Sequence, residues 1–313
     1  MSGRPWSDRD LEERVKGTLE LMASRGYNPS SEHLASGLLG GVADVPDVEA
    51  AIEAAEGMDL HEGLAFVEGK SYIDMCKRRL EANSHHQPLY RRIAEAYTRD
   101  LVAACPWVKC VMLVGSVATG GLCEGDDLDL NLVVEDGRKY STNLIGGLLN
   151  RKYSFRYRNQ LVREREGHYI IPMVVCLNII WEESQVSPLA RQDEQVAYEL
   201  FSGEVLHGEE FHRYMLARNA WLRHFYPQMY DEAVGSPGHP GPRGAVRVGV
   251  MERLSRGTLF AFDRLVRLYL TRRPSAVERM EYWDDLKHPY GLYHLPGVDD
   301  EPYRRDGTRG EGP

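Results

Sequence analysis

The amino-acid sequence predicts an α+β protein: a mixed sheet flanked by helices, with a smaller helical unit before it and further helices after it. Two apolar segments, residues 111–114 and 128–134, have the length and the branched side chains of buried strands. Residues 72–104 have helical spacing and lead into the first strand, and we expect this helix to break before Pro88. A chain of 313 residues is long enough for more than one domain of roughly 100–200 residues.

The composition is that of a globular chain with a sizeable core. Hydrophobic residues make up 42% and charged residues 27%, and no apolar run approaches the roughly 20 residues that a membrane span needs. The cysteines lack the C-x-x-C spacing of a zinc site, and the first residues lack the apolar stretch of a signal peptide, so we expect a cytoplasmic location. The cysteines are Cys76, Cys105, Cys110, Cys123 and Cys176. The net charge of −9 argues against a general polyanion binder, because phosphate contacts need clustered Lys and Arg.

Residues 1–70 carry the pattern of three helices followed by a short hairpin. The helical patterns cover residues 8–25, 31–39 and 46–56. Two short apolar segments then flank a Glu-Gly pair at positions 62–63, as in a β-hairpin. This order of elements resembles the winged-helix domains, so we expect a winged-helix-like domain at the N-terminus.

The third of these helices bears on whether the N-terminal domain contacts DNA. In winged-helix domains the third helix often enters the major groove. Here residues 46–57 contain four acidic residues and neither Lys nor Arg, so this helix would repel phosphates. The pattern therefore argues against DNA binding and favours a protein-contacting or purely architectural role.

The segment that carries chemistry joins the two predicted strands. The first strand ends at Gly115 and Ser116, a turn whose N–H groups and hydroxyl are suited to phosphate oxygens. In the second strand Asp127 and Asp129 alternate with apolar residues, which places both carboxylates on one side, about 7 Å apart along the backbone. Carboxylate oxygens are ligands that Mg²⁺ prefers. The alternative interpretation is an acidic turn that only joins two core strands.

The strand, the Gly-Ser turn and the Asp-x-Asp pair resemble the signature of the DNA polymerase β-like nucleotidyltransferases. The resemblance is close over residues 89–134 and weaker through residue 208. Residues 196–208 are similar to the helix and the Leu-His-Gly turn that follow this core in many relatives. The resemblance therefore implies a polymerase β-like nucleotidyltransferase core over residues 71–208.

The same resemblance implies a role for each residue of the motif. Gly115 and Ser116 match the turn that binds the β- and γ-phosphates of a nucleoside triphosphate. Asp127 and Asp129 match the pair that holds the metal ions, for which two ions of Mg²⁺ or Mn²⁺ are expected.

Members of this superfamily usually carry a third carboxylate on a neighbouring strand. The best candidate strand here covers residues 170–181, and its only polar side chain at mid-strand is Asn178. An Asn oxygen can coordinate a metal but cannot act as a base, so Asn178 is the candidate catalytic residue at this position, with a purely structural role as the alternative. Glu182, four residues after Asn178, faces the same side of the strand but lies about 13 Å further along it. Either two aspartates suffice, or another residue completes the site, or nucleotide binds without turnover.

A triphosphate also needs positive charge near the two aspartates. Basic residues cluster between residues 151 and 165, and Lys152 and Arg163 are the candidates for nucleotide binding. Spacing alone does not choose among the basic side chains of this cluster, and a solvated face is the alternative interpretation.

Residues 209–296 form the third part, a C-terminal helical region. Helical patterns of apolar and aromatic side chains cover residues 211–225 and 246–271, separated by a loop rich in Gly and Pro. The apolar face expected of the second helix consists of Leu254, Leu259, Phe262, Leu265, Val266 and Leu270. Residues 297–313 are polar and Gly-rich without periodicity, and we expect them to be disordered.

These observations lead to two functional hypotheses. The first is a metal-dependent nucleotidyltransferase, an enzyme that moves NMP from an NTP to a hydroxyl of a small molecule, a protein or an RNA and releases pyrophosphate. The alternative is a catalytically weak or inactive nucleotide-binding regulator that acts through its winged-helix-like domain. The pair Asp127 and Asp129 favours the first, and Asn178 favours the second. The acceptor, the base of the NTP and the oligomeric state have no signature in the sequence.

Overall fold

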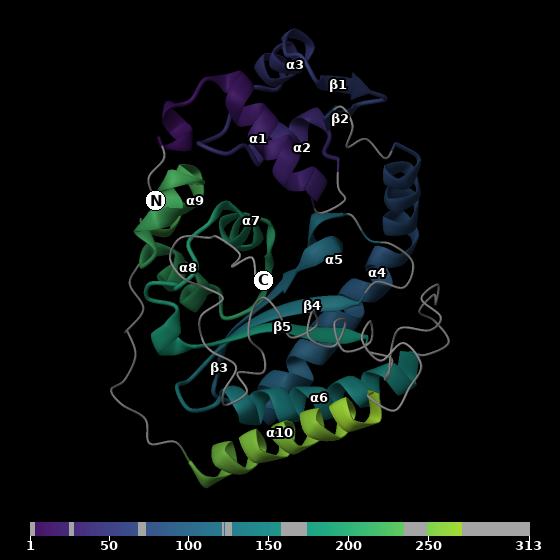
Figure 1. The fold of residues 1–313 in the computed structure, drawn as a ribbon, viewed down its shortest axis with the longest axis vertical. Helices are drawn as coiled ribbons and strands as arrows, with labels where there is room; N and C mark the ends of the chain where they lie inside the picture. Colours follow the sequence, from purple (N-terminus) through teal and green to yellow (C-terminus); the bar gives the residue numbers. More distant parts are fainter. Residues whose placement is uncertain are drawn as a thin grey trace.

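The computed structural model describes residues 4–24, 28–67, 73–120, 122, 127–157, 174–234 and 249–270. These residues form an α+β fold in which a mixed four-stranded sheet is flanked by helices, as the sequence predicted (Figure 1). In this part of the chain no helix combines the length and the apolar character needed to cross a membrane.

The N-terminal unit contains the predicted three helices followed by a hairpin. Its elements are α1 (Leu11–Ser24), α2 (Ser31–Ser36), α3 (Val45–Ala54) and the antiparallel strands β1 (Met58–His61) and β2 (Leu64–Val67). A 3₁₀ turn, Trp6–Asp8, precedes α1. The hairpin turns at Glu62 and Gly63, whose φ angles of 51° and 79° lie in the left-handed region that glycine adopts at little cost.

The central sheet has the strand order β5-β4-β3-β6. Its strands are β3 (Val108–Val114), β4 (Leu128–Val134), β5 (Val175–Glu182) and β6 (Glu204–His207). β4 and β5 are parallel, and the other neighbouring pairs are antiparallel. The connection between the parallel strands includes α6 (Lys139–Tyr157), and it brings the start of β5 beside the start of β4.

One face of the sheet is covered by two long helices, α4 (Ile73–Ala104) and α6 (Figure 1). Tyr97 of α4 is fully buried, and its hydroxyl donates to the carbonyl oxygen of Gly146 in α6 over 2.8 Å. The break predicted in α4 is wrong, because the helix continues through Pro88. At Pro88 the helix lacks the hydrogen bond that a proline nitrogen cannot donate, and the helix is maintained on both sides.

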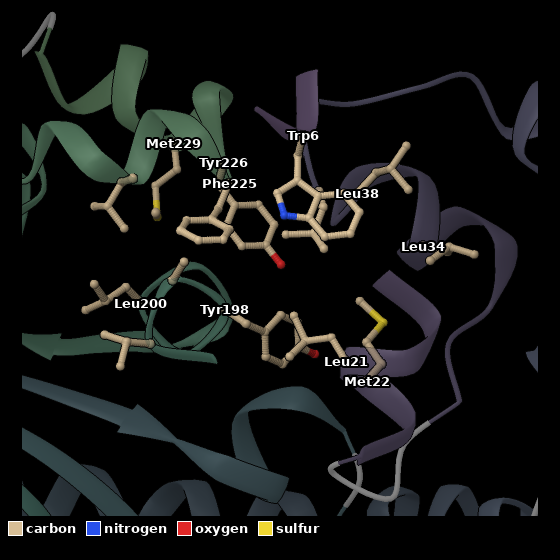
Figure 2. Packing of buried hydrophobic residues seen from close by; sticks show 14 of the residues in the cluster. Trp6, Leu21, Met22, Leu34, Leu38, Tyr198, Leu200, Phe225, Tyr226 and Met229 are labelled. Atoms are coloured by element: carbon tan, nitrogen blue, oxygen red, sulfur yellow. The ribbon is translucent and has the colours of Figure 1, made fainter. Parts of the chain in front are cut away.

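The other face of the sheet shares a core with the N-terminal unit and with the helices that follow β5. These helices are α7 (Glu194–Ser202), α8 (Glu209–Ala217) and α9 (Pro227–Val234). Figure 2 shows Trp6, Met22 and Leu38 of the N-terminal unit in one cluster with Tyr198 of α7 and Tyr226, the residue before α9. The N-terminal unit and the helices after β5 are therefore parts of one packed body.

Two glycines allow close packing around Trp6. A Cβ atom at Gly17 of α1 would lie 2.2 Å from the indole ring of Trp6, so the ring lies against bare backbone. Gly40 has a φ of +82°, and its N–H donates to the carbonyl oxygen of Phe225 over 2.6 Å. Side chains at these positions would displace Trp6, which belongs to the core that the N-terminal unit shares with the helices after β5.

The single aromatic-rich helix predicted over residues 211–225 is divided into α8 and a 3₁₀ segment, Ala220–His224. Asn219 lies between them and is fully buried. Its amide nitrogen donates to the carbonyl oxygens of Val186 and Met215 over 2.8 and 2.7 Å. An Asn side chain that satisfies backbone groups in this way competes with a continuous helix, which explains the break.

The last described helix, α10 (Val250–Leu270), packs along α6 (Figure 1). The Glu252 carboxylate accepts from the backbone N–H groups of Tyr140 and Ser141, in the first turn of α6, over 2.6 and 2.8 Å. A carboxylate at a helix N-terminus satisfies N–H groups that have no partner inside the helix and interacts favourably with the helix dipole.

The apolar face predicted for α10 is only partly buried. Leu259 and Val266 are buried, whereas Leu254 and Leu265 are 66% and 64% exposed. The physical reason is that the hydrogen bonds of Glu252 fix the rotation of α10 about its axis, and this rotation turns the two exposed leucines away from α6. The Gly- and Pro-rich loop before α10 lies almost wholly outside the described residues, and the tail predicted to be disordered lies entirely outside them.

Candidate functional site

Gly115 is the residue at which β3 turns into the short helix α5 (Gly115–Thr119). Its φ of +72° lies in the left-handed region, and a Cβ atom there would lie 2.6 Å from Oδ2 of Asp129. Only glycine therefore lets the turn approach the aspartate this closely. Ser116 follows on α5 and is half-buried. The predicted Gly-Ser turn thus lies directly beside one of the predicted aspartates.

Asp127 and Asp129 lie at the start of β4, where the sequence placed them on one side of a strand. Carboxylate oxygens of both residues and the sulfur of Cys176 all lie within 4.8 Å of one another, and all three side chains are half-buried. In the described ranges this is the one group of His, Cys, Asp and Glu side chains compact enough to hold a metal ion. The group therefore has the compactness that a divalent-cation site requires.

The sequence interpretation missed Cys176 as a member of this group. The parallel pairing of β4 and β5 makes it the Cα partner of Asp129. Burial, and after it the nearby carboxylates of Asp129 and Asp127, raise the pKa of the Cys176 thiol well above its usual value, and the thiol donates to Asp129. Without a metal the group is therefore a protonated thiol at neutral pH, and not a nucleophilic thiolate. Cys176 could have been considered from the sequence, because it is two residues from Asn178 in the same strand and therefore faces the same side of the sheet.

Asn178 pairs with another strand residue and not with the aspartates. Its Nδ2 donates to Oδ1 of Asn131 in β4 over 3.2 Å. Asn131 is only 1% exposed, and its own Nδ2 has no hydrogen-bond partner among the residues that the structure describes. This placement agrees with the structural alternative for Asn178, a buried amide that pairs with a neighbour. A catalytic role for Asn178 stays a prediction.

Glu182, the other residue considered as a third acid, lies at the far end of the strand pair. It is the Cα partner of Val134, whereas Asp129 pairs with Cys176. Its Oε1 accepts from the N–H of Gly137 over 2.8 Å. The strand does not bend back toward the aspartates, so Glu182 does not join the site.

The structure does not bring the predicted nucleotide-binding Lys152 to the aspartates. Lys152 is on α6, which covers the sheet face lined by side chains such as Leu130, whereas Asp129 alternates to the opposite face. Its Nζ donates to Oδ2 of Asp100 over 2.8 Å, in an exposed ion pair. Its position therefore does not support a contact with a triphosphate at the aspartates. Arg163 lies outside the described residues.

Two carboxylates, a thiol and a glycine turn thus meet where β3 ends and β4 and β5 begin. Carboxylate oxygens suit Mg²⁺ and Mn²⁺, and a thiol adds affinity for softer cations. Comparison of the chain with models of protein families, with curated proteins and with solved structures gives no match.

Proposed function

We propose that the chain is a metal-dependent nucleotidyltransferase of the DNA polymerase β-like type, with its active site at Asp127 and Asp129. The observation that supports this is the turn at Gly115, which lies against Asp129 so closely that no side chain fits between them. Nucleotidyl transfer needs a place for phosphate oxygens directly beside carboxylates that hold cations. In the reaction a hydroxyl oxygen of a small molecule, a protein or an RNA bonds to the α-phosphorus of an NTP, and pyrophosphate leaves.

Each residue of the motif has a role in this proposal. Asp127 and Asp129 hold the divalent cations, and the family resemblance implies two ions of Mg²⁺ or Mn²⁺. Such ions, when bound, supply positive charge that stabilises the attacking and leaving oxygens. The N–H of Gly115 and the hydroxyl of Ser116 donate to phosphate oxygens. The donor set, two half-buried carboxylates with a thiol beside them, fits a divalent cation.

Turnover of labelled NTP tests the proposal. Pyrophosphate release should depend on Mg²⁺ or Mn²⁺ and should fall on the order of 100-fold or more in Asp129→Asn, the size seen when one preorganised electrostatic group is removed. The matched control is Asp231→Asn, the same change at an exposed carboxylate of α9 paired with Arg223. Equal turnover by Asp129→Asn and wild type would contradict the proposal.

Nucleotide binding is a second measurement of the same site. The affinity for NTP, measured by calorimetry, should be lost in EDTA and in Asp127→Ala, because the carboxylate-bound cation neutralises the triphosphate. Equal affinity in Mg²⁺ and in EDTA would exclude a two-aspartate metal site.

A second candidate function is a nucleotide-binding regulator with weak or no turnover. The observation that favours it is the residue beside Asp129 on the neighbouring strand, Cys176, which is a protonated thiol where a third carboxylate would act as a base. Metal-dependent NTP binding without pyrophosphate release, over a broad set of acceptors, would favour this candidate over the enzyme.

A further inference from the structure

The three side chains of the site form a donor set of mixed chemistry. Asp127, Asp129 and Cys176 each direct one ligand atom into a group whose members lie within 4.8 Å of one another. Cys176 is held there by the sheet, since it pairs with Asp129 across the parallel strands β4 and β5. Its sulfur is therefore positioned by the same backbone hydrogen bonds that position the Asp129 carboxylate.

A second feature, on the same face of β4, also points to a ligand. Asn131 lies one alternation step beyond Asp129 and is 1% exposed. Its Oδ1 accepts from Asn178, but its Nδ2 has no partner among the described residues. A buried amide without a partner is costly, so it is expected where a bound ligand supplies the missing oxygen. Three polar residues therefore alternate along this face: the half-buried Asp127 and Asp129, and then the buried Asn131, whose Nδ2 has no acceptor among the described residues.

We propose that the Cys176 sulfur is a third ligand of the cation that Asp127 and Asp129 hold, and that the site selects a thiophilic divalent cation over Mg²⁺. The inference rests on the proposed function only for the presence of a cation at the two aspartates. On binding, the thiol gives its proton to solvent and the thiolate sulfur donates an electron pair to the cation. Oxygen ligands alone suit Mg²⁺, whereas a thiolate favours Zn²⁺ and similar cations, so the sulfur changes which ion is preferred.

Titration of the full-length protein with Cd²⁺, without nucleotide, tests the sulfur ligand directly. A cadmium–thiolate bond absorbs in the ultraviolet, so the wild-type protein should gain a saturable absorption band. Cys176→Ser should lose the band and bind Cd²⁺ at least about tenfold more weakly, since even a partner outside the ligand shell contributes about 10- to 100-fold. Cys105→Ser, the matched control that lacks one buried thiol on the opposite side of the sheet, should keep both the band and the affinity. A band that persists in Cys176→Ser overturns the proposal.

Exchange for a carboxylate tests the ion preference. Cys176→Asp replaces sulfur by oxygen, so Mg²⁺ affinity should rise by about tenfold and Cd²⁺ affinity should fall. Asn178→Asp adds the same carboxylate two residues further along β5, at the residue that donates to Asn131, and should raise Mg²⁺ affinity clearly less than Cys176→Asp does. Equal gains in both variants would overturn the assignment to position 176. Thermal unfolding checks that the variants fold, and Cys176→Ser, which keeps the side-chain size, decides the result if Cys176→Asp does not.

These outcomes separate the inference from the proposed function. A cadmium band that depends on Cys176, in a protein that binds no NTP, supports the sulfur ligand and rejects the nucleotidyltransferase. Transfer that is faster with Mg²⁺ than with thiophilic cations, and that Cys176→Ser leaves unchanged, supports the nucleotidyltransferase and rejects the sulfur ligand.

Discussion

The two faces of the central sheet are built from alternate residues of the same strands, and they differ in kind. Toward α4 and α6 the strands present fully buried apolar side chains such as Leu130 and Leu132. The intervening positions of β4 hold Asp129 and Asn131, and Cys176 of β5 lies beside the aspartate. One strand pair thus presents an apolar face to α4 and α6 and a partly polar face on the other side. Substitutions on the two faces should therefore separate stability from binding.

The largest effect on stability is expected on the apolar face. Tyr97→Ala removes a fully buried ring that packs edge-on against Tyr153, and should lower the free energy of unfolding by about 3–5 kcal/mol. Tyr97→Phe, which removes only the hydroxyl bonded to Gly146, should cost about 0.5–1.5 kcal/mol. Urea unfolding measures both changes. Loss of Cd²⁺ affinity by Tyr97→Ala, under conditions in which the variant is folded, would show that the two faces are not independent.

The helices that cover the site face contain a group that should make stability depend on pH. His212 of α8 is buried, and its burial lowers its pKa to about 4, while Glu209 raises this pKa and Arg213 lowers it by smaller amounts. In the unfolded chain the imidazole of His212 binds a proton below about pH 6.5, whereas in the folded protein it does so only below about pH 4. Acid between these two pH values therefore favours unfolding. Stability should be full above about pH 6.5 and fall by up to about 1.4 kcal/mol per pH unit between about pH 6.5 and 4.

Unfolding in urea at several pH values between about 7 and 5 checks this expectation. His212→Gln should remove this part of the pH dependence, because the amide does not titrate. His61→Gln, at an exposed residue of the N-terminal hairpin, is the matched control and should leave the slope as in wild type. If His212→Gln and His61→Gln have the same slope, His212 does not carry the effect.

A change that affects binding as well as stability is expected on the site face. Gly115→Ala places a Cβ atom 2.6 Å from Asp129 Oδ2, so the carboxylate must move and Cd²⁺ affinity should fall by at least about tenfold. The φ of +72° adds strain of about 1–3 kcal/mol. Gly147→Ala in α6, where nothing lies within 4 Å of the new Cβ atom, is the matched control and should leave affinity unchanged. Calorimetry with Cd²⁺ and urea unfolding separate the two quantities, and unchanged affinity in Gly115→Ala would remove the turn from the site.

Local patterns predicted most of the elements, and they failed where distant contacts decide. The three N-terminal helices, the hairpin and the strands around the Gly-Ser turn could be predicted from periodicity. The continuation of α4 through Pro88 and the exposure of Leu254 and Leu265 could not. In α10 the rotation of the helix depends on hydrogen bonds from Glu252 to the start of α6, more than a hundred positions earlier in the chain.

The candidate site was likewise predictable where it depends on local sequence and not where it depends on distant contacts. Gly115 follows and Asp127 precedes the two strands of one antiparallel pair, in which Asp129 is the partner of Val114, so their proximity follows from their spacing in the sequence. Whether Cys176 or Asn178 lies beside Asp129 depends on the register of β5 against β4. This register includes a shift between Leu130 and Asn131, and α6 lies in the connection between the two strands. A two-residue shift of that register would place Asn178 beside Asp129 and move Cys176 away, and the apolar–polar alternation of the sequence would be the same.

The smallest effect is expected from the N-terminal unit, for which we predict no DNA binding. Between positions 46 and 57 the third helix and its ends carry four acidic residues and neither Lys nor Arg. Because Trp6 and Leu38 share a core with Tyr226, the isolated unit would expose apolar surface that is buried in the whole chain (Figure 2). The full-length protein is therefore the sample to test.

A labelled duplex titrated with full-length protein at physiological salt should show no change in fluorescence anisotropy. Acidic side chains that face phosphates release no counterions, so the main sequence-independent driving force for association is missing. The double variant Asp47→Lys/Glu53→Lys reverses two exposed charges of α3 and is the positive control, because it should gain weak binding that disappears as salt is raised. Micromolar binding by the wild type with a steep salt dependence would contradict the prediction. It would also favour the regulator over the enzyme, since the N-terminal unit would then have a nucleic-acid partner of its own.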